Sequence, residues 1–245
     1  MKIYLAGSGW NKIWEKMNFF TFNRLETFWG INAKKEGPKV KLYDNYMLDS
    51  GAFSMFGSKE KTDLDAYVTN MINFINEYDV KQFFELDIYA LIGKEKTDII
   101  NKRIEKETGK QTIPVFHFFL GTDEYKRMCE EYEYISISAS GFYAAKWTRK
   151  EPEKLRKLID YAHSKNVRVH GLGYTALNML DKMPFDSVDS TAWLSGNRFG
   201  MVYEWLGDKF KKHPKKEGQR VYTDKTAKHN FHEWVKFSNF ANKNY

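Results

Sequence analysis

Three apolar segments of the sequence each run into an aspartate, and these three carboxylates are the residues best suited to do chemistry. They are Asp49, Asp87 and Asp189. A carboxylate at the end of a buried strand is costly unless a charge or a hydrogen-bond donor meets it, and parallel α/β sheets and barrels place their active sites at these ends. For any one of them, a helix N-cap or an Asx-turn is a simpler explanation. Three such segments together favour a shared mouth lined by carboxylates.

Two carboxylates in one mouth suit the breaking of an N-glycosidic bond. That reaction passes through an oxocarbenium-like transition state, and a carboxylate nucleophile can hold the sugar as a covalent intermediate while the base leaves. One carboxylate must stay ionised to attack, whereas the other must exchange protons with the departing and entering bases. We therefore expect different surroundings to separate the two pKa values.

The composition indicates one packed globular domain. The chain has 245 residues, of which 42% are hydrophobic and 17% aromatic, with five prolines and 16 glycines. These values exclude a disordered or low-complexity chain, and the length suits one barrel or one large α/β domain. The formal net charge of +7 is a moderate basic bias, which suits a polyanionic partner without requiring one.

The single cysteine, Cys129, excludes an internal disulfide and a cysteine-rich zinc site. Its neighbours Tyr125, Met128 and Tyr132 have helical spacing, which predicts a buried packing role for it. A lone cysteine fits a reducing compartment, the first residues do not resemble a signal peptide, and no apolar stretch approaches the length of a membrane span. The sequence therefore predicts a cytoplasmic protein.

Apolar runs alternate with amphipathic stretches along the chain, which predicts alternating strands and helices. Seven or eight strands with intervening helices and no internal repeat favour an α/β fold of the (β/α)8 TIM-like barrel type, with some reduced or irregular elements. We expect a single domain over 1–245, with a basic segment at 207–228 and a C-terminal helix at 225–241. The predicted strands are 2–6, 46–49, 82–87, 113–117, 134–138, 167–172 and 185–189, with 198–203 as an eighth strand or a hairpin arm, and the predicted helices include 10–29, 64–78, 98–108 and segments starting near 122, 152 and 175.

Four segments resemble motifs of the tRNA-guanine transglycosylases, the queuine and archaeosine tRNA-ribosyltransferase superfamily. Leu-Asp-Ser-Gly-Ala-Phe at 48–53 resembles the family's Asp-Ser-Gly-Gly-Phe motif, and Leu-Asp-Ile at 86–88 resembles its base-recognition segment. Gly-Leu-Gly-Tyr at 171–174 and Phe-Asp-Ser-Val-Asp-Ser at 185–190 resemble its glycine-containing strand and its nucleophile segment. Their order and approximate spacing agree with the family over 47–198. The resemblance implies a barrel that exchanges guanine for a 7-deazaguanine without a cofactor.

The resemblance implies a role for each matching residue. Asp189 takes the place of the family's nucleophile, Asp49 that of its general acid/base, and Asp87 that of the aspartate that binds the guanine edge. An aspartate can accept hydrogen bonds from the ring N–H and the amino group of a guanine-like base, which neither adenine nor a pyrimidine offers. The other implied substrate contacts are Phe53, matching the ring that stacks on the base, Ser50, Gly51, Gly171 and Gly173, with Ser138 near the family's backbone-contacting glycines, His117 in place of a family glutamine, and Asp186.

Three polar residues near the predicted strand ends have two possible roles each on the sequence alone. Asp186 is expected on the same face as Asp189, where it would tune the nucleophile or tie down a neighbouring strand, and the second role is favoured. His117 and His170 would help at the mouth or be satisfied core histidines, and for His170 the core role is favoured.

The chain departs from the tRNA enzymes by lacking their zinc subdomain of three cysteines and a histidine. It is more similar to the compact DNA-modifying paralogues of the family, many of them associated with phages. The implied acceptor is therefore DNA, with tRNA as the alternative, and the implied incoming substrate is a free base such as 7-cyano-7-deazaguanine. No metal is expected, the need for helper proteins stays open, and a phage-encoded protein would act in the host cytoplasm.

Two other functions use some of the same residues. In a metal-dependent barrel hydrolase, His117, His170 and Asp189 would ligate a divalent ion, although the paired histidines usual in such barrels do not occur. In a non-catalytic nucleic-acid-binding protein, the basic segment would contact phosphates. The residues expected to touch nucleic acid in either a binding protein or a transglycosylase are Lys211, Lys212, Lys215, Lys216 and Arg198.

Overall fold

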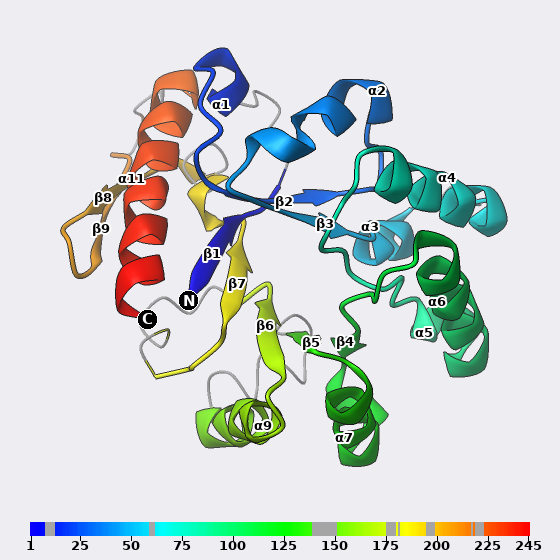
Figure 1. Cartoon of the computed structure of the whole chain (residues 1–245). Helices are drawn as coiled ribbons and strands as arrows, with labels where there is room; N and C mark the ends of the chain where they lie inside the picture. Colours follow the sequence, from blue (N-terminus) through cyan, green and yellow to red (C-terminus); the bar gives the residue numbers. More distant parts are fainter. Residues whose placement is uncertain are drawn as a thin grey trace.

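A curled, parallel seven-stranded sheet forms the centre of the computed structural model, with helices around its outside (Figure 1). The structure describes residues 1–7, 13–58, 62–138, 151–174, 180, 182–194, 199–216, 218 and 223–245. The strand order is β3-β2-β1-β7-β6-β5-β4. The strands are β1 (Lys2–Leu5), β2 (Asn23–Thr27), β3 (Asn45–Asp49), β4 (Val115–Phe116), β5 (Tyr134–Ser138), β6 (Arg168–Leu172) and β7 (Ser187–Ser190). The α/β class and the TIM-like curl are confirmed, whereas these seven strands alone do not close into a barrel.

The predicted strand at 82–87 lies in the gap between the two edge strands, β3 and β4. It makes only isolated parallel bridges, from Phe83 to Leu48 and from Phe84 to Ile113. Beyond them, side chains replace the backbone partners of a regular ladder. The carboxylate of Glu85 accepts the Val115 N–H at 2.7 Å. This use of a side chain explains why the segment is extended without being a full strand.

Alternate residues of the strands supply two separate cores. The larger core lies between the outer face of the sheet and the helices, and residues such as Leu5 and Leu48 contribute to it. The smaller core fills the concave inner face and consists of Tyr4, Ala6, Leu25, Met47, Phe84, Ile113, Val115 and Tyr134, with Leu172 packed against them. Polar side chains that follow these apolar residues on the inner face therefore lie at the carboxyl ends of the strands.

The helices on the outer face follow the amphipathic stretches of the sequence. In α4 the buried residues Val68, Met71, Ile72 and Ile75 recur at three and four, and the Asp63 side chain caps the helix by accepting the Ala66 N–H at 3.1 Å. The helices are α1 (Ile13–Lys16), α2 (Ala33–Glu36), α3 (Ala52–Gly57), α4 (Leu64–Glu77), α5 (Tyr89–Ile92), α6 (Lys94–Thr108), α7 (Thr122–Glu131), α9 (Pro152–Ser164) and α11 (Thr223–Asn244), with short 3-10 segments at Gly37–Leu42, Phe118–Leu120 and Ala192–Leu194.

The prediction of one helix over 10–29 is wrong, because this stretch contains α1 and then strand β2. The sequence of β2 is Asn-Arg-Leu-Glu-Thr, which has a single apolar residue. Its charged side chains are nevertheless buried: Arg24 pairs with Glu26 at 2.5 Å, and its guanidinium lies 4.6 Å from the centre of the Trp14 ring. Arg24 also donates to the backbone oxygen of Leu5 at 2.8 Å. Internal pairing thus allows a charged segment to form a central strand.

The predicted strand at 198–203 is a hairpin arm. Strand β8 (Met201–Trp205) pairs in antiparallel fashion with β9 (Phe210–Pro214) in a separate two-stranded sheet. The hairpin lies against the outside of α11, which confirms the predicted C-terminal helix (Figure 1). The helix predicted near 175 falls outside the described residues. Across the described parts of the chain, none of the helices combines the length and the apolar character needed to cross a membrane.

Candidate active site at the strand ends

Asp49 is the last residue of strand β3, and its side chain hydrogen-bonds to the loop that follows. Its Oδ1 accepts the Gly51 N–H at 3.2 Å, so the Asx-turn that the sequence offered as a simple explanation is present. Gly51 has φ of 82°, and a Cβ there would lie 2.7 Å from the Cβ of Trp29. The Tyr67 hydroxyl fixes the same loop by donating to the Ser50 backbone oxygen at 2.6 Å. The loop therefore requires glycine at this position.

The surroundings of Asp49 also shift the pKa of its carboxyl. Burial is the main cause and, together with the negative charges of Asp87 and Asp189, raises the pKa of Asp49 to about 7, against hydrogen bonds from Gly51 and Thr27 that lower it. Asp49 therefore lies within electrostatic reach of Asp87 and Asp189, the two carboxylates predicted to share its mouth. The Asx-turn is thus one of several interactions of Asp49.

Asp189 lies on β7 at the inner face, with only 6% of its surface exposed. Its Oδ1 accepts the Gly173 N–H at 2.5 Å and lies 3.3 Å from Nε2 of His170. Gly173 has φ of 69°, a conformation that glycine adopts without strain, and this turn aims its N–H at the carboxylate. Among the described residues, both polar contacts of Asp189 fall on the same oxygen, Oδ1.

His170 is fully buried beneath Asp189 in the inner core. Its Nδ1 lies 2.5 Å from Oγ of Ser187, and that oxygen lies 2.5 Å from the hydroxyl of Tyr134. The ring packs between Tyr4 and Phe84, at centroid distances of 6.1 and 5.2 Å. His170 is thus a satisfied core histidine, the explanation that the sequence favoured, and it also contacts the predicted nucleophile.

Asp87 and His117 form a pair at a more open part of the mouth. His117 Nε2 lies 2.8 Å from Asp87 Oδ2, and the two side chains keep 23% and 15% of their surface exposed. The His117 ring stacks on Phe119, at 5.3 Å between centroids and 22° between planes. Phe119 is 63% exposed and Phe53, on α3, is 82% exposed. An exposed ring beside paired polar groups, as Phe119 is beside His117, can receive a flat, hydrogen-bonding ligand.

The remaining predicted contacts divide into buried and distant residues. Ser50 and Ser138 are both buried at strand ends. Gly171 is needed for packing, because a Cβ there would lie 3.0 Å from the Phe185 ring. The prediction that Asp186 shares the face of Asp189 is wrong, because the two positions differ by three and side chains alternate along a strand. Asp186 lies at the amino end of β7, where it accepts the Val169 N–H at 2.7 Å, so it ties β7 to β6 as the structural alternative predicted.

The four predicted phosphate-contacting lysines lie on or just after β9. Lys211 and Lys212 are exposed on that strand, and Lys215 and Lys216 are exposed directly beyond it. The Lys215 N–H donates to the Gly200 oxygen at 3.1 Å, which holds the end of the hairpin beside the start of β8. The Phe210 side chain anchors the hairpin by stacking on Trp234 of α11, with centroids 5.0 Å apart. Arg198 lies outside the described residues.

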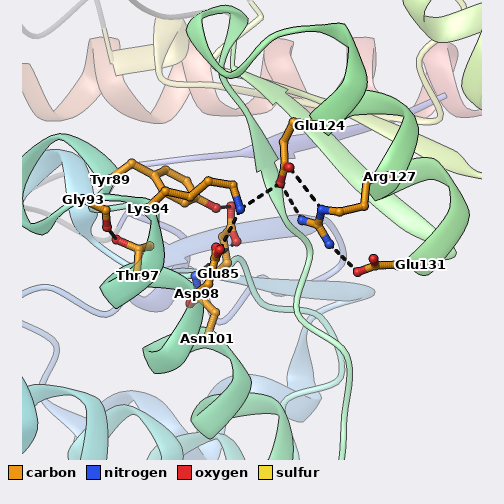
Figure 2. A network of polar contacts seen from close by, with 10 residues as sticks. All are labelled: Glu85, Tyr89, Gly93, Lys94, Thr97, Asp98, Asn101, Glu124, Arg127 and Glu131. Atoms are coloured by element: carbon orange, nitrogen blue, oxygen red, sulfur yellow. Dashed lines mark hydrogen bonds and ion pairs between the residues drawn. The ribbon is translucent and has the colours of Figure 1, made fainter.

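A buried carboxylate that the sequence did not reveal supports the Asp87 segment from the outer side (Figure 2). Glu85 accepts hydrogen bonds from the Val115 N–H at 2.7 Å, the Tyr89 hydroxyl at 2.7 Å and the Asn101 side-chain amide at 3.1 Å. Burial raises its pKa to about 8, despite the lowering effect of these donors. In the same view, Lys94 links the carboxylates of Asp98 and Glu124 at the surface.

No group of three or more histidines, cysteines, aspartates or glutamates in the described ranges could hold a metal ion. The histidines of the hydrolase hypothesis contact different aspartates, since His117 pairs with Asp87 and His170 with Asp189. Cys129 is buried on α7 as predicted, and burial raises the pKa of its thiol to about 11.

Comparison with known proteins adds little to this geometry. No protein-family model matches the chain, and none of the curated proteins matches it. A solved structure described as "QR15, an Aldolase" is similar over 78% of this chain and 90% of its own, with 13% sequence identity and a TM-score of 0.44. A similarity at that level carries no inference about activity or substrate.

Proposed function

We propose that the protein is a base-exchange glycosyltransferase that replaces guanine in DNA with a 7-deazaguanine through a covalent aspartyl–sugar intermediate. The observation that carries the proposal is the triad of strand-end carboxylates, in which Asp49 has a pKa of about 7 and is electrostatically coupled to Asp87 and Asp189. The motifs at 48–53, 86–88, 171–174 and 185–190 support the same assignment through their resemblance to the transglycosylases.

In the first displacement, Oδ2 of Asp189 attacks the anomeric carbon of the sugar, and the bond from that carbon to the guanine nitrogen breaks. The electron pair of the broken bond goes to the departing base, which takes a proton from Asp49. A carboxyl with a pKa near 7 is protonated in about half of the molecules at neutral pH, so it can supply this proton.

In the second displacement, the nitrogen of the incoming 7-deazaguanine attacks the same carbon and releases Asp189 as a carboxylate. The attacking nitrogen gives up its proton to Asp49, which returns the enzyme to its starting state. Two inversions retain the configuration at the sugar, and neither step requires a cofactor.

Asp87 would select the base by accepting from the ring N–H and the amino group of its guanine-like edge. His117 supports this role by holding Oδ2 of Asp87 at 2.8 Å, which orients the carboxylate before the base arrives. The exposed ring of Phe53 would stack on the base. A base without the two donors would lose both hydrogen bonds to Asp87, which lowers its affinity relative to a guanine-like base.

DNA is the proposed acceptor because the hairpin offers exposed lysines for backbone phosphates and the chain has no cysteine-rich zinc subdomain. Duplex DNA would have to release its target nucleotide from the stack, since Asp189 keeps only 6% of its surface exposed. A tRNA acceptor would use the same chemistry.

The experiment is incorporation of labelled 7-cyano-7-deazaguanine by the purified protein into DNA and tRNA offered in competition. We expect label in DNA, none with Asp189→Asn, and full label with Asp123→Asn, which removes a fully exposed carboxylate on α7. Without incoming base, the wild-type protein should form a covalent adduct with the nucleic acid, visible by denaturing electrophoresis. Full activity of Asp189→Asn would refute the nucleophile, and preferential labelling of tRNA would refute the acceptor alone.

A further inference from the structure

A chain of buried polar side chains runs through the inner core from Tyr134 to the predicted nucleophile. The Tyr134 hydroxyl contacts Ser187, Ser187 contacts Nδ1 of His170, and Nε2 of His170 contacts Oδ1 of Asp189. His170 and Ser187 are at most 1% exposed. Strand register creates this alignment, because β6 and β7 pair His170 with Ser187, and Asp189 follows on the same face two residues later.

The protons of this chain can be assigned from the available partners. Among the described residues, Ser187 is the hydrogen-bond partner of the Tyr134 hydroxyl, so the buried O–H of Tyr134 is satisfied by donating to Ser187. Ser187 then has one proton left to donate, and Nδ1 of His170 accepts it. An imidazole that accepts at Nδ1 carries its proton at Nε2, which faces the carboxylate of Asp189.

We propose that His170 is a positioning residue for the nucleophile: its Nε2–H tautomer, fixed by Ser187 and Tyr134, binds Oδ1 of Asp189 and thereby presents Oδ2 to the sugar. This inference rests on the proposed function for its consequence in catalysis. The Gly173 N–H binds the same oxygen at 2.5 Å, so a side-chain donor and a backbone donor hold one oxygen of the carboxylate.

The same two donors act at both stages of the proposed exchange. While the sugar is bound to Oδ2, Oδ1 is the carbonyl oxygen of an ester and still accepts both hydrogen bonds. When the second base displaces Asp189, negative charge returns to the carboxylate, and donors that are already aligned stabilise it without reorganisation. His170 therefore affects the rate of the displacements, while base recognition stays with the Asp87 segment.

The first test is spectroscopic and does not need the reaction. In protein with ¹⁵N-labelled histidine, the signal that disappears in His170→Phe should show a protonated Nε2 and an unprotonated, hydrogen-bonded Nδ1. Ser187→Ala should change the Nδ1 signal, and Asp189→Ala should change the Nε2 signal. A proton on Nδ1 in the wild-type protein would overturn the proposal, whether or not base exchange is observed.

The second test is kinetic and compares replacements of similar size. His170→Phe should lower kcat about 100-fold while KM for the incoming base stays within about threefold, since misplacement of a reacting group by about 1 Å has effects of this order. His170→Gln, which can donate to Asp189, should recover most of the loss. If His170→Phe does not fold by circular dichroism, Ser187→Ala gives the same comparison, with a smaller loss. Wild-type kcat in a folded His170→Phe or Ser187→Ala protein would overturn the proposal.

Discussion

Replacing Glu85 with glutamine should change the pH dependence of stability in a way that can be calculated from its environment. Burial raises the pKa of Glu85 from its ordinary value of 4.5 to about 8. A carboxyl whose pKa is raised in the folded protein favours folding when protonated. Its contribution is therefore fully present below about pH 4.5 and is lost as the pH rises through 8.

The expected magnitude follows from the shift. One pKa unit corresponds to about 1.36 kcal/mol, so a rise from 4.5 to about 8 removes up to about 5 kcal/mol of unfolding free energy across this range. Glutamine keeps an oxygen for the Val115 N–H and the Tyr89 hydroxyl but cannot accept from Asn101, which costs about 1 kcal/mol. Glu85→Gln should thus be about 1 kcal/mol less stable than the wild type at pH 4.5 and about 3 to 4 kcal/mol more stable at pH 8.5.

The measurement is urea unfolding, followed by circular dichroism, at half-unit steps from pH 4.5 to 8.5. Asp49 titrates in the same range in both proteins, so the difference between the two curves isolates Glu85. Glu95→Gln, which changes an exposed carboxylate on α6, should run parallel to the wild type. A Glu85→Gln curve that also runs parallel to the wild type would show that Glu85 does not titrate as its burial requires.

Four further outcomes are expected. The pKa of Asp49 near 7 should make kcat/KM fall as the pH rises above 7, and Asp49→Asn should flatten this limb at a rate at least about 100-fold lower. Gly51→Ala should cost about 2 kcal/mol or more in urea unfolding, since φ is 82° and the new Cβ would meet Trp29, whereas Gly57→Ala meets nothing within 4 Å and should be nearly neutral. Changing Lys211, Lys212, Lys215 and Lys216 to alanine should weaken DNA binding for all sequences. It should also reduce the slope of the logarithm of the binding constant against the logarithm of the salt concentration by up to about 3.6, at about 0.9 per phosphate contact. The control with Lys102→Ala and Lys106→Ala on α6 should change neither quantity. Activity should survive chelation and dialysis, and recovery that depends on added zinc would favour the hydrolase instead.

The sequence predicted the parts of the fold that are apolar and regular. Strands β1, β3, β5 and β6 carry apolar runs, and their predicted bounds agree with the structure within one residue. Strand β2 was missed because its stability depends on the internal pairing of Arg24 with Glu26, which no hydrophobic pattern records. The strand at 82–87 was overestimated because the Glu85 side chain takes the place of a backbone acceptor.

The same distinction applies to the candidate site. Asp49, Asp87 and Asp189 could be found from sequence, because each follows an apolar run and parallel strands bring such ends together. The prediction that Asp186 shares the face of Asp189 was wrong, because the two positions differ by three and side chains alternate along a strand. The contacts of His170 could not be found from sequence, since they depend on the register of β6 against β7.

Exposure increases across the candidate site from the nucleophile to the rings, and this gradient constrains what can react there. The Asp189 side chain is 9% exposed, Asp87 is 15% exposed, and Phe53 is 82% exposed as a whole residue. In the proposed reaction, the departing guanine and the incoming base are both recognised by Asp87 beside His117. Guanine must therefore leave Asp87 before the second base can bind there, while the sugar stays bound to the buried carboxylate of Asp189.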